Sequence, residues 1–249
     1  MIPYRKSDRP LSEIFGERYF TPFSGVSSFT KPYTWENEGT KCMVRAWRIK
    51  EIFNPDSALD LGCSRGFQIK ALLALGVEAR GWDVSSWAIE HCEPEAQGRV
   101  KQGNIAEMNE LHWWPPADVV VSMETLEHLP DYEIAWVVSE IARLAKIGAY
   151  IEVPVGLGID NEPSGDITHQ TFMPPSWWIS VFHTHGLLYD PRFSTLEVDA
   201  LHLNCKAAAD RGSVELAQQP GVASFVFWKG RLPDAVPPPR LIINGRPDA

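Results

Sequence analysis

The chain has 249 residues, of which 44% are hydrophobic and 22% are charged, and its formal net charge is −9. This length and composition provide the core of one domain, or at most two, and exclude wholesale disorder. An acidic surface repels phosphate backbones, so general binding of nucleic acids is not expected. A membrane span needs roughly 18 apolar residues in a row, and the sequence contains no such run.

The N-terminus and the cysteines bear on the compartment. Residues 1–8 lack the apolar stretch of a secretory signal, and the four cysteines form no C-x-x-C pair. This cysteine usage fits a reducing cytosol, so we expect a cytoplasmic protein.

Composition and periodicity divide the chain into three regions. Residues 1–56 combine an aperiodic stretch rich in aromatic residues, interpreted as a lid, with a helix predicted over 38–53. Residues 57–232 are predicted to form the main domain. The proline-rich tail, 233–249, is expected to be loosely ordered.

Within the main domain, short apolar strands alternate with helices of 3.6-residue periodicity. Strands are predicted at 58–61, 77–83, 99–103, 118–122, 149–153, 187–198 and 223–228. Helices are predicted after the first strand, from Ser85 or Ser86, from Asp131 to a stop at Gly148, and around Trp177. This alternation is typical of an α/β fold with a Rossmann-like, doubly wound parallel sheet.

The turn Gly62-Cys63-Ser64-Arg65-Gly66 after the first strand lets backbone amides approach a ligand closely. A dinucleotide fold would need glycines where Ser64 and Phe67 stand. The G-x-S-x-G pattern of serine hydrolases is present, but several strands and an oxyanion-hole glycine cluster should precede it, and residues 1–57 hold no such cluster. Both of these interpretations are weak. The third interpretation is that the turn binds a nucleoside that carries an amino acid.

Three polar residues meet the requirements of such a nucleoside. A carboxylate, Asp60, precedes the glycines. A second acid, Asp83, ends the second strand 23 residues later, and Asn104 follows the third strand. An acid at this spacing binds ribose hydroxyls in dinucleotide folds, so the same contact is expected here.

Four motifs occur in the order of a known family: D-L-G-C-S-R-G at 60–66, G-W-D-V-S at 81–85, G-N-I at 103–105 and D-V-V-V-S-M-E-T-L-E-H-L-P at 118–130. With these motifs, residues 58–153 resemble class I S-adenosylmethionine (SAM) dependent methyltransferases of the small-molecule and sugar branch. The resemblance implies a seven-stranded sheet whose last strand is antiparallel. It also implies SAM as the cofactor and S-adenosylhomocysteine as its product.

The resemblance assigns roles to the residues that match. Asp60 and the glycine turn would hold the methionine part of the cofactor, and Asp83 would hold the ribose. Ser64 replaces the usual middle glycine, so the turn must have φ values that serine can adopt. Asn104 replaces a common aspartate, but its amide oxygen can still accept from adenine. The implied cofactor-binding set is Asp60, Gly62, Cys63, Ser64, Gly66, Asp83, Val84, Asn104, Ile105, Met123 and Glu124.

Residues beyond the fifth strand are expected to face the methyl acceptor. Asp166-Ile167-Thr168-His169 resembles a D-x-T-H pattern of family relatives, in which a helix bearing tryptophan follows. A loop that Asp166 and His169 merely tie down is an equally good interpretation. The predicted substrate-binding residues are Tyr33, Trp35, Asp166, Trp177 and Trp178.

The deprotonation of an alcohol acceptor requires a general base, and histidine is suited to this near neutral pH. We predict that His169 is this base and that Asp166 or Glu127 orients it. His128, which follows the fourth strand, is the second candidate.

These features together predict SAM-dependent methyl transfer to a small polar acceptor, at an oxygen of a sugar or secondary metabolite. Transfer to nitrogen or carbon and a non-catalytic SAM-binding regulator stay open as alternatives. No metal site is expected, because His183 and His185 are two residues apart and point to different faces of a helix. Neither nucleic acid nor a membrane is an expected partner, and a homodimer is left open.

Overall fold

The computed structural model describes residues 11–107, 114–156, 164–198, 203–204 and 221–233. The strands are β1 (Ser57–Leu61), β2 (Glu78–Asp83), β3 (Val100–Gln102), β4 (Ala117–Met123), β5 (Ala145–Val155), β6 (Leu187–Tyr189), β7 (Thr195–Val198), β8 (Leu203–Asn204) and β9 (Gly221–Lys229). The helices are α1 (Leu11–Ile14), α2 (Trp35–Phe53), α3 (Phe67–Ala74), α4 (Ser86–Glu90), α6 (Asp131–Leu144) and α7 (Pro175–Thr184), with short 3-10 turns η1 (Pro94–Ala96) and η2 (Leu126–His128).

The strands form one sheet with the order β3-β2-β1-β4-β5-β9, and β6 pairs with β9 at its far side. The first five strands are parallel, while β9 is antiparallel to β5. The predicted α/β fold, a doubly wound sheet of seven strands with its last strand antiparallel, is therefore confirmed. The structure adds a small hairpin, β7 and β8, which pairs with the beginning of β9.

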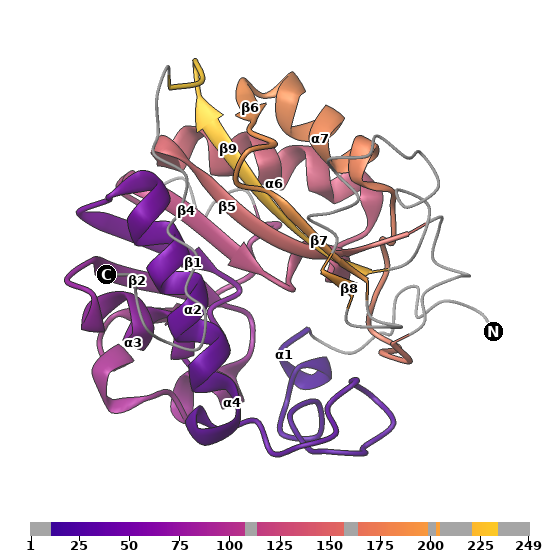
Figure 1. Cartoon of the computed structure of the whole chain (residues 1–249). Coiled ribbons are helices and arrows are strands. Elements are labelled where there is room, and N and C mark those ends of the chain that lie inside the picture. Colours follow the sequence, from indigo (N-terminus) through magenta and orange to yellow (C-terminus); the bar gives the residue numbers. More distant parts are fainter. Residues whose placement is uncertain (1–10, 108–113, 157–163, 199–202, 205–220, 234–249) are drawn as a thin grey trace.

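Each face of the sheet carries its own hydrophobic core. Helices α2 and α3 cover one face, and α6 and α7 cover the other (Figure 1). Alternate residues of β4 point to opposite faces: Val120 packs toward α6, whereas Val119 and Val121 pack toward α2 and α3. A strand buried on both faces reads as a continuous apolar run, which is how β4 appears in the sequence.

Two differences from the predicted elements have a clear physical cause. The helix α6 ends at Leu144, and Gly148 lies inside β5 rather than at a helix stop. A Cβ at Gly148 would lie 2.2 Å from the carbonyl oxygen of Phe227 on β9, so the close approach of the two strands requires glycine here. The predicted strand 187–198 is two strands, β6 and β7, because Asp190 and Pro191 begin a turn between them.

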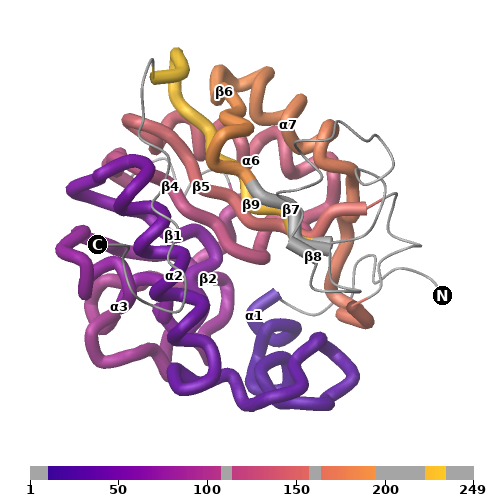
Figure 2. The backbone as a smooth tube through the Cα atoms, viewed as in Figure 1, coloured from indigo at the N-terminus to yellow at the C-terminus, as the bar shows by residue number. Residues whose placement is uncertain are grey.

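The N-terminal segment, residues 11–33, consists of the short helix α1 and an irregular loop, and it lies away from α7 (Figure 2). Three hydrogen bonds anchor it: Ser85 Oγ donates to the Phe15 carbonyl, Ile167 N to the Val26 carbonyl and an Arg65 guanidinium nitrogen to the Tyr33 carbonyl. The tail from 234 onward lies outside the described residues. Among the residues described, no helix combines the length and apolar character needed to cross a membrane.

A buried ion pair joins α2 to the middle of the sheet. Arg45 donates two hydrogen bonds to the carboxylate of Glu152 on β5, one of them 3.0 Å long, and both residues are less than 10% exposed. Ser224 on β9 donates to the same carboxylate. The pair therefore links a helix to two strands at the edge where loops gather.

Removal of one partner of this ion pair should lower the free energy of unfolding more than removal of both partners. We expect Arg45→Met to lower the free energy of unfolding by about 3–5 kcal/mol, because Glu152 is left as a buried, uncompensated charge. The double variant Arg45→Met/Glu152→Met should recover most of this loss. Urea denaturation of the three proteins measures both effects, and a double variant as unstable as the single one would contradict the explanation.

Candidate functional site

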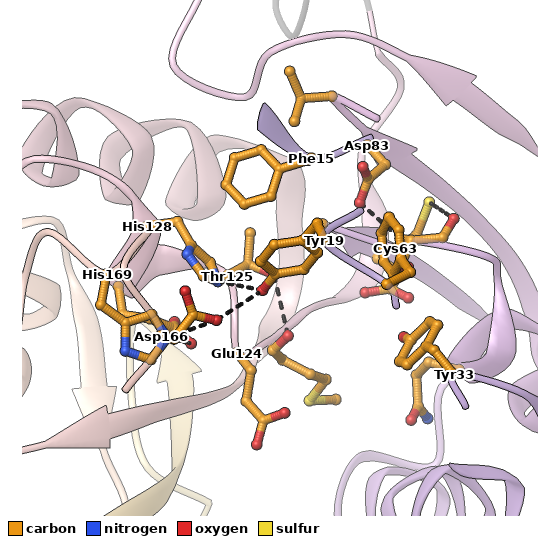
Figure 3. Close-up of a pocket in the computed structure, with 18 of the residues that line it drawn as sticks. Phe15, Tyr19, Tyr33, Cys63, Asp83, Glu124, Thr125, His128, Asp166 and His169 are labelled. Carbon is orange, nitrogen blue, oxygen red and sulfur yellow. Dashed lines mark hydrogen bonds and ion pairs between the residues drawn. The ribbon is translucent and has the colours of Figure 1, made fainter. Parts of the chain in front are cut away.

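A cavity of about 300 Å³ opens at the carboxyl ends of the parallel strands (Figure 3). Its walls come from the ends of β1, β2 and β4, from the loop after β5, and from the N-terminal segment. Ligands of open α/β sheets bind at this edge, because the strand ends and the following loops meet there. One side of the cavity is built by the glycine turn and the other by a cluster of histidines and acids.

The glycine turn has a left-handed residue where the family has glycine. Ser64 adopts φ 48°, in the region that side chains disfavour. Its backbone N–H donates to Oδ2 of Asp83 at 2.7 Å, and Ser85 N donates to the other carboxylate oxygen at 2.8 Å. Asp83 thus holds the turn in place, and each of its oxygens keeps a second acceptor position directed elsewhere.

Asp60 is the buried carboxyl group at the end of β1. It is 2% exposed, and its Oδ1 atom has no hydrogen-bond partner among the described residues. Burial, and to a lesser degree the charge of Asp83, raises the pKa of Asp60 to about 7. A buried acceptor atom at the wall of a cavity fits a cationic group of a ligand, such as the ammonium of an amino acid.

Ten of the eleven residues predicted to hold the cofactor line this one cavity. Asn104 does so although its Oδ1 already accepts from Ala106 N at 3.0 Å. Gly66 is the exception: it precedes α3, and a Cβ there would lie 2.4 Å from the Ala96 side chain. The arrangement fits a nucleoside that carries an amino acid, while the individual contacts stay predictions.

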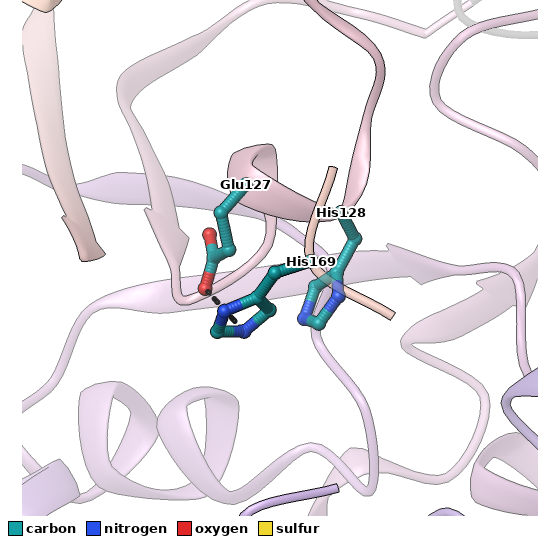
Figure 4. Close-up of side chains that lie close together, drawn as sticks. All are labelled: Glu127, His128 and His169. Carbon is teal, nitrogen blue, oxygen red and sulfur yellow. Dashed lines mark ion pairs between the residues drawn. The ribbon is translucent and has the colours of Figure 1, made fainter. Parts of the chain in front are cut away.

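A cluster of three groups lies opposite the glycine turn. Glu127, His128 and His169 bring one ligand atom each to within 4.8 Å of one another (Figure 4). His169 Nε2 is 4.0 Å from Glu127 Oε1 and 3.9 Å from Oδ2 of Asp166. Glu127 and His128 belong to the turn after β4 and His169 to the loop after β5, so the sequence alone did not bring the three groups together.

Tyr19 joins this cluster from the N-terminal segment. Its hydroxyl is 3.3 Å from His128 Nε2 and 3.3 Å from Oδ2 of Asp166. Thr168 Oγ1 lies 2.9 Å from the other ring nitrogen of His128 and donates to Oδ1 of Asp166 at 2.5 Å. The four side chains form a closed ring of contacts, part of which is visible in Figure 3.

The shortest contact of the hydrogen-bond ring, between Thr168 and Asp166, indicates the tautomer of His128. The single hydrogen of the Thr168 hydroxyl goes to Asp166, so Thr168 can only accept from His128, and Nδ1 carries the proton. Burial, followed by the charge of His169, lowers the pKa of His128 to about 4. At neutral pH the imidazole of His128 is therefore uncharged, with a lone pair on Nε2. Burial raises the pKa of Glu127 to about 8, so this acid holds a proton more readily than usual.

Three predicted acceptor-binding residues do not line the cavity. Trp178 is fully buried in the core between α7 and the sheet, and Trp177 packs against the same core. Trp35 lies over α3, with the Lys70 ammonium 4.6 Å from its ring. Tyr33 and Asp166 do line the cavity. Trp177 and Trp178 have packing roles because α7 covers the face of the sheet opposite to α2 and α3.

Two further residues contact the cluster: Thr168, which had no predicted role, and Tyr19, which was predicted only as one of the aromatic residues of a lid. Thr168 lies two residues after Asp166, and its backbone N–H donates to Oδ1 of that residue at 2.9 Å. An aspartate that accepts from the second residue along is the signature of an Asx turn, so this signal was present in D-x-T-H. Tyr19 gave no such signal, because nothing in an aperiodic segment shows which of its aromatic residues reaches a site.

Comparisons with known proteins identify a methyltransferase domain. Residues 58–148 match a family model described as a methyltransferase domain. Over 102 residues the chain is 35% identical to the ubiquinone biosynthesis O-methyltransferase of Methylococcus capsulatus, a match that covers 38% of this chain. The match spans only 40% of the length of that curated relative.

Solved structures show the same fold. A SAM-dependent methyltransferase from Archaeoglobus fulgidus has a TM-score of 0.56 at 18% identity, over 79% of this chain and 100% of that one. The magnesium protoporphyrin IX methyltransferase of Synechocystis PCC 6803, solved with bound SAM, has a TM-score of 0.50 at 13% identity, over 77% and 80%. The family model and the shared fold together support a class I SAM-dependent methyltransferase domain that includes residues 58–148.

Proposed function

We propose that the protein transfers the methyl group of SAM to an oxygen of a small polar acceptor, such as a sugar or a secondary metabolite. One observation carries the choice of oxygen: a neutral histidine with a lone pair on Nε2, His128, shares a cavity with the residues expected to hold the cofactor. The name of the curated relative, an O-methyltransferase, supports the same choice. Its acceptor is not transferred to this chain, because the match is partial.

The residues of the chain bind, orient and shield, since the bound cofactor supplies an already activated methyl group. Asp60 and Asp83 would hold the polar ends of the cofactor, and the N-terminal segment would exclude water from the cavity. Proximity and orientation of this kind contribute roughly 7–11 kcal/mol to lowering a barrier. What the acceptor still requires is the removal of its proton.

The geometry favours His128 over His169 for this task. Thr168 and Asp166 hold the Nδ1–H of His128 and leave Nε2 as an acceptor. In His169, by contrast, Nε2 faces the carboxyl groups of Glu127 and Asp166 at 4.0 and 3.9 Å. The preference for His169 drawn from the sequence therefore changes to His128, and both assignments are open to test.

Methyl transfer is tested directly with radiolabelled SAM and a panel that contains catechol, phenol, glucose and rhamnose. Label in the ether product supports the proposal. If SAM binds but its labelled methyl group is transferred neither to the panel nor to any component of a cell extract, the chain is a SAM-binding regulator instead. Transfer only to amines or carbon acids would show the alternative chemistry of the same fold.

Replacement of His128 should separate catalysis from cofactor binding. We expect His128→Asn to reduce kcat by about 10²–10⁴-fold, the usual contribution of a general base. The affinity for SAM, measured by calorimetry, should stay within twofold. His169→Asn is the matched comparison, and a larger loss of turnover in that variant would return the role to His169.

The buried Asp60 should make cofactor binding depend on pH. Its pKa of about 7 means that it is mostly protonated at pH 6 and ionised at pH 8. Only the carboxylate attracts the ammonium of SAM, so the rise in Tm caused by the cofactor should be larger at pH 8. Without SAM the sign reverses: the folded chain holds the extra proton between about pH 4 and 7, so stability falls as pH rises through this window.

Thermal denaturation with and without SAM across pH 5–9 measures both trends. Asp60→Asn should flatten them, whereas Glu36→Gln, at an exposed acid of α2, should leave them unchanged. If the rise in Tm caused by SAM still depends on pH in Asp60→Asn, another group is responsible for the dependence, and Glu127 is the next candidate.

A further inference from the structure

The hydrogen-bond ring around His128 is one proton short. Its four contacts need four hydrogens if Asp166 is ionised, because a carboxylate only accepts. Tyr19, Thr168 and a neutral His128 supply one hydrogen each. The hydrogens of Thr168 and of Nδ1 are used in the two short contacts, so the deficit lies at the Tyr19 hydroxyl.

The distances agree with this placement of the deficit. Both contacts of Tyr19 are 3.3 Å long, whereas the two contacts of Thr168 are 2.9 and 2.5 Å. The single hydrogen of the phenol can go to His128 Nε2 or to Asp166, but not to both. A proton delivered to Nε2 completes the ring, because Nε2–H then donates to Tyr19 and Tyr19 donates to Asp166. The protein thus has a hydrogen-bonded place ready for an incoming proton.

Aromatic rings hold Tyr19 in this position. Phe15 and Phe20 meet its ring edge-on at 5.0 and 5.1 Å, and Phe29 does so at 5.8 Å. Burial, with the charges of Asp166 and Glu127, raises the pKa of Tyr19 well above its usual value. The phenol therefore remains neutral and is not itself a base. A neutral hydroxyl that touches a base can still accept one proton while it gives up another.

We propose that Tyr19 is a catalytic residue that relays the proton of the acceptor hydroxyl to His128. The acceptor O–H bond breaks as its hydrogen bonds to the Tyr19 oxygen, and the original phenolic hydrogen moves to Nε2. The electron pair of the broken O–H bond stays on the acceptor oxygen, which uses it for the new bond to the methyl carbon. The S–CH₃ bond of bound SAM would break with its electron pair kept on sulfur, so that S-adenosylhomocysteine leaves. Tyr19 ends neutral, His128 ends as imidazolium, and the ring is complete.

This inference rests on the proposed O-methylation and adds to it. In the closed arrangement the lone pair of His128 faces the Tyr19 hydroxyl, so the acceptor reaches the base through that hydroxyl. The other charged or titratable groups near His128 are His169, Asp166, Glu127 and Glu124. Asp166 belongs to the hydrogen-bond ring, but the contact between Tyr19 and Nε2 of His128 is direct. Because Tyr19 belongs to the N-terminal segment, the relay exists only when that segment is docked.

The first test needs no acceptor. Nitrogen-15 NMR of the histidine rings should show His128 as the Nδ1–H tautomer, with Nε2 accepting a hydrogen bond in the wild type. Tyr19→Phe keeps the aromatic side chain and its packing but removes the hydroxyl. The signal of His128 Nε2 should therefore shift to that of an imidazole nitrogen that accepts no hydrogen bond. A wild-type Nε2–H tautomer would overturn the relay, because Nε2 could then receive no proton.

The second test uses the acceptor identified from the panel of phenols and sugars. We expect Tyr19→Phe to lower kcat by about 100-fold, at the low end of general acid–base effects, with SAM affinity unchanged. Rates in mixtures of H₂O and D₂O should give a curved proton inventory for the wild type, since two protons move together, and a linear one for Tyr19→Phe. Equal or faster turnover by Tyr19→Phe would overturn the relay.

Controls distinguish a relay from a role in packing. Phe29→Leu loosens the rings around Tyr19 and is expected to keep the curved inventory, whereas a linear one would show that segment packing alone causes the curvature. If the wild type methylates its acceptor, His128→Asn is inactive and Tyr19→Phe is fully active, the relay fails while the proposed function stands. If the wild type methylates no acceptor of any kind, the proposed function fails and the relay with it.

Discussion

The carboxylate of Asp83 accepts hydrogen bonds from two backbone amides that belong to different turns, Ser64 N and Ser85 N. Through the first it holds the glycine turn in a conformation that serine disfavours, and through the second it fixes the start of α4. The side chain of Ser85 in turn donates to the Phe15 carbonyl and anchors the N-terminal segment. The cofactor side of the cavity and the segment that covers it thus depend on one acidic residue at the end of β2.

The sequence was sufficient for the part of the site that regular elements build. Asp60 and Asp83 end adjacent parallel strands, and such ends always meet at one edge of a sheet, so their place followed from the strand pattern. Trp178 shows the limit of this reasoning: helical periodicity identifies a buried face but not which face of the sheet it covers. For Gly148 the reason is similar, because only the approach of β9 distinguishes a strand glycine from a helix stop.

The acceptor side of the cavity has a different origin. Tyr19, His128 and Asp166 come from three segments separated by more than 30 residues, none of them a strand, and their meeting depends on tertiary packing. A motif such as D-x-T-H indicates its own local turn but not the tyrosine that faces it. This division is common in α/β enzymes, in which the scaffold fixes the cofactor and irregular loops determine the chemistry.

The hydrogen bond from Ile167 N to the Val26 carbonyl ties the N-terminal segment to the loop that carries Asp166. If the segment swings away to admit an acceptor, this bond must break and Asp166 loses a neighbour that positions it. Tyr19 leaves His128 in the same movement. An open molecule would therefore admit ligands while it lacks the means to deprotonate them, and a closed one would have the means but exclude water. With the proposed relay, the entry of an acceptor and its deprotonation would therefore require two different positions of the N-terminal segment.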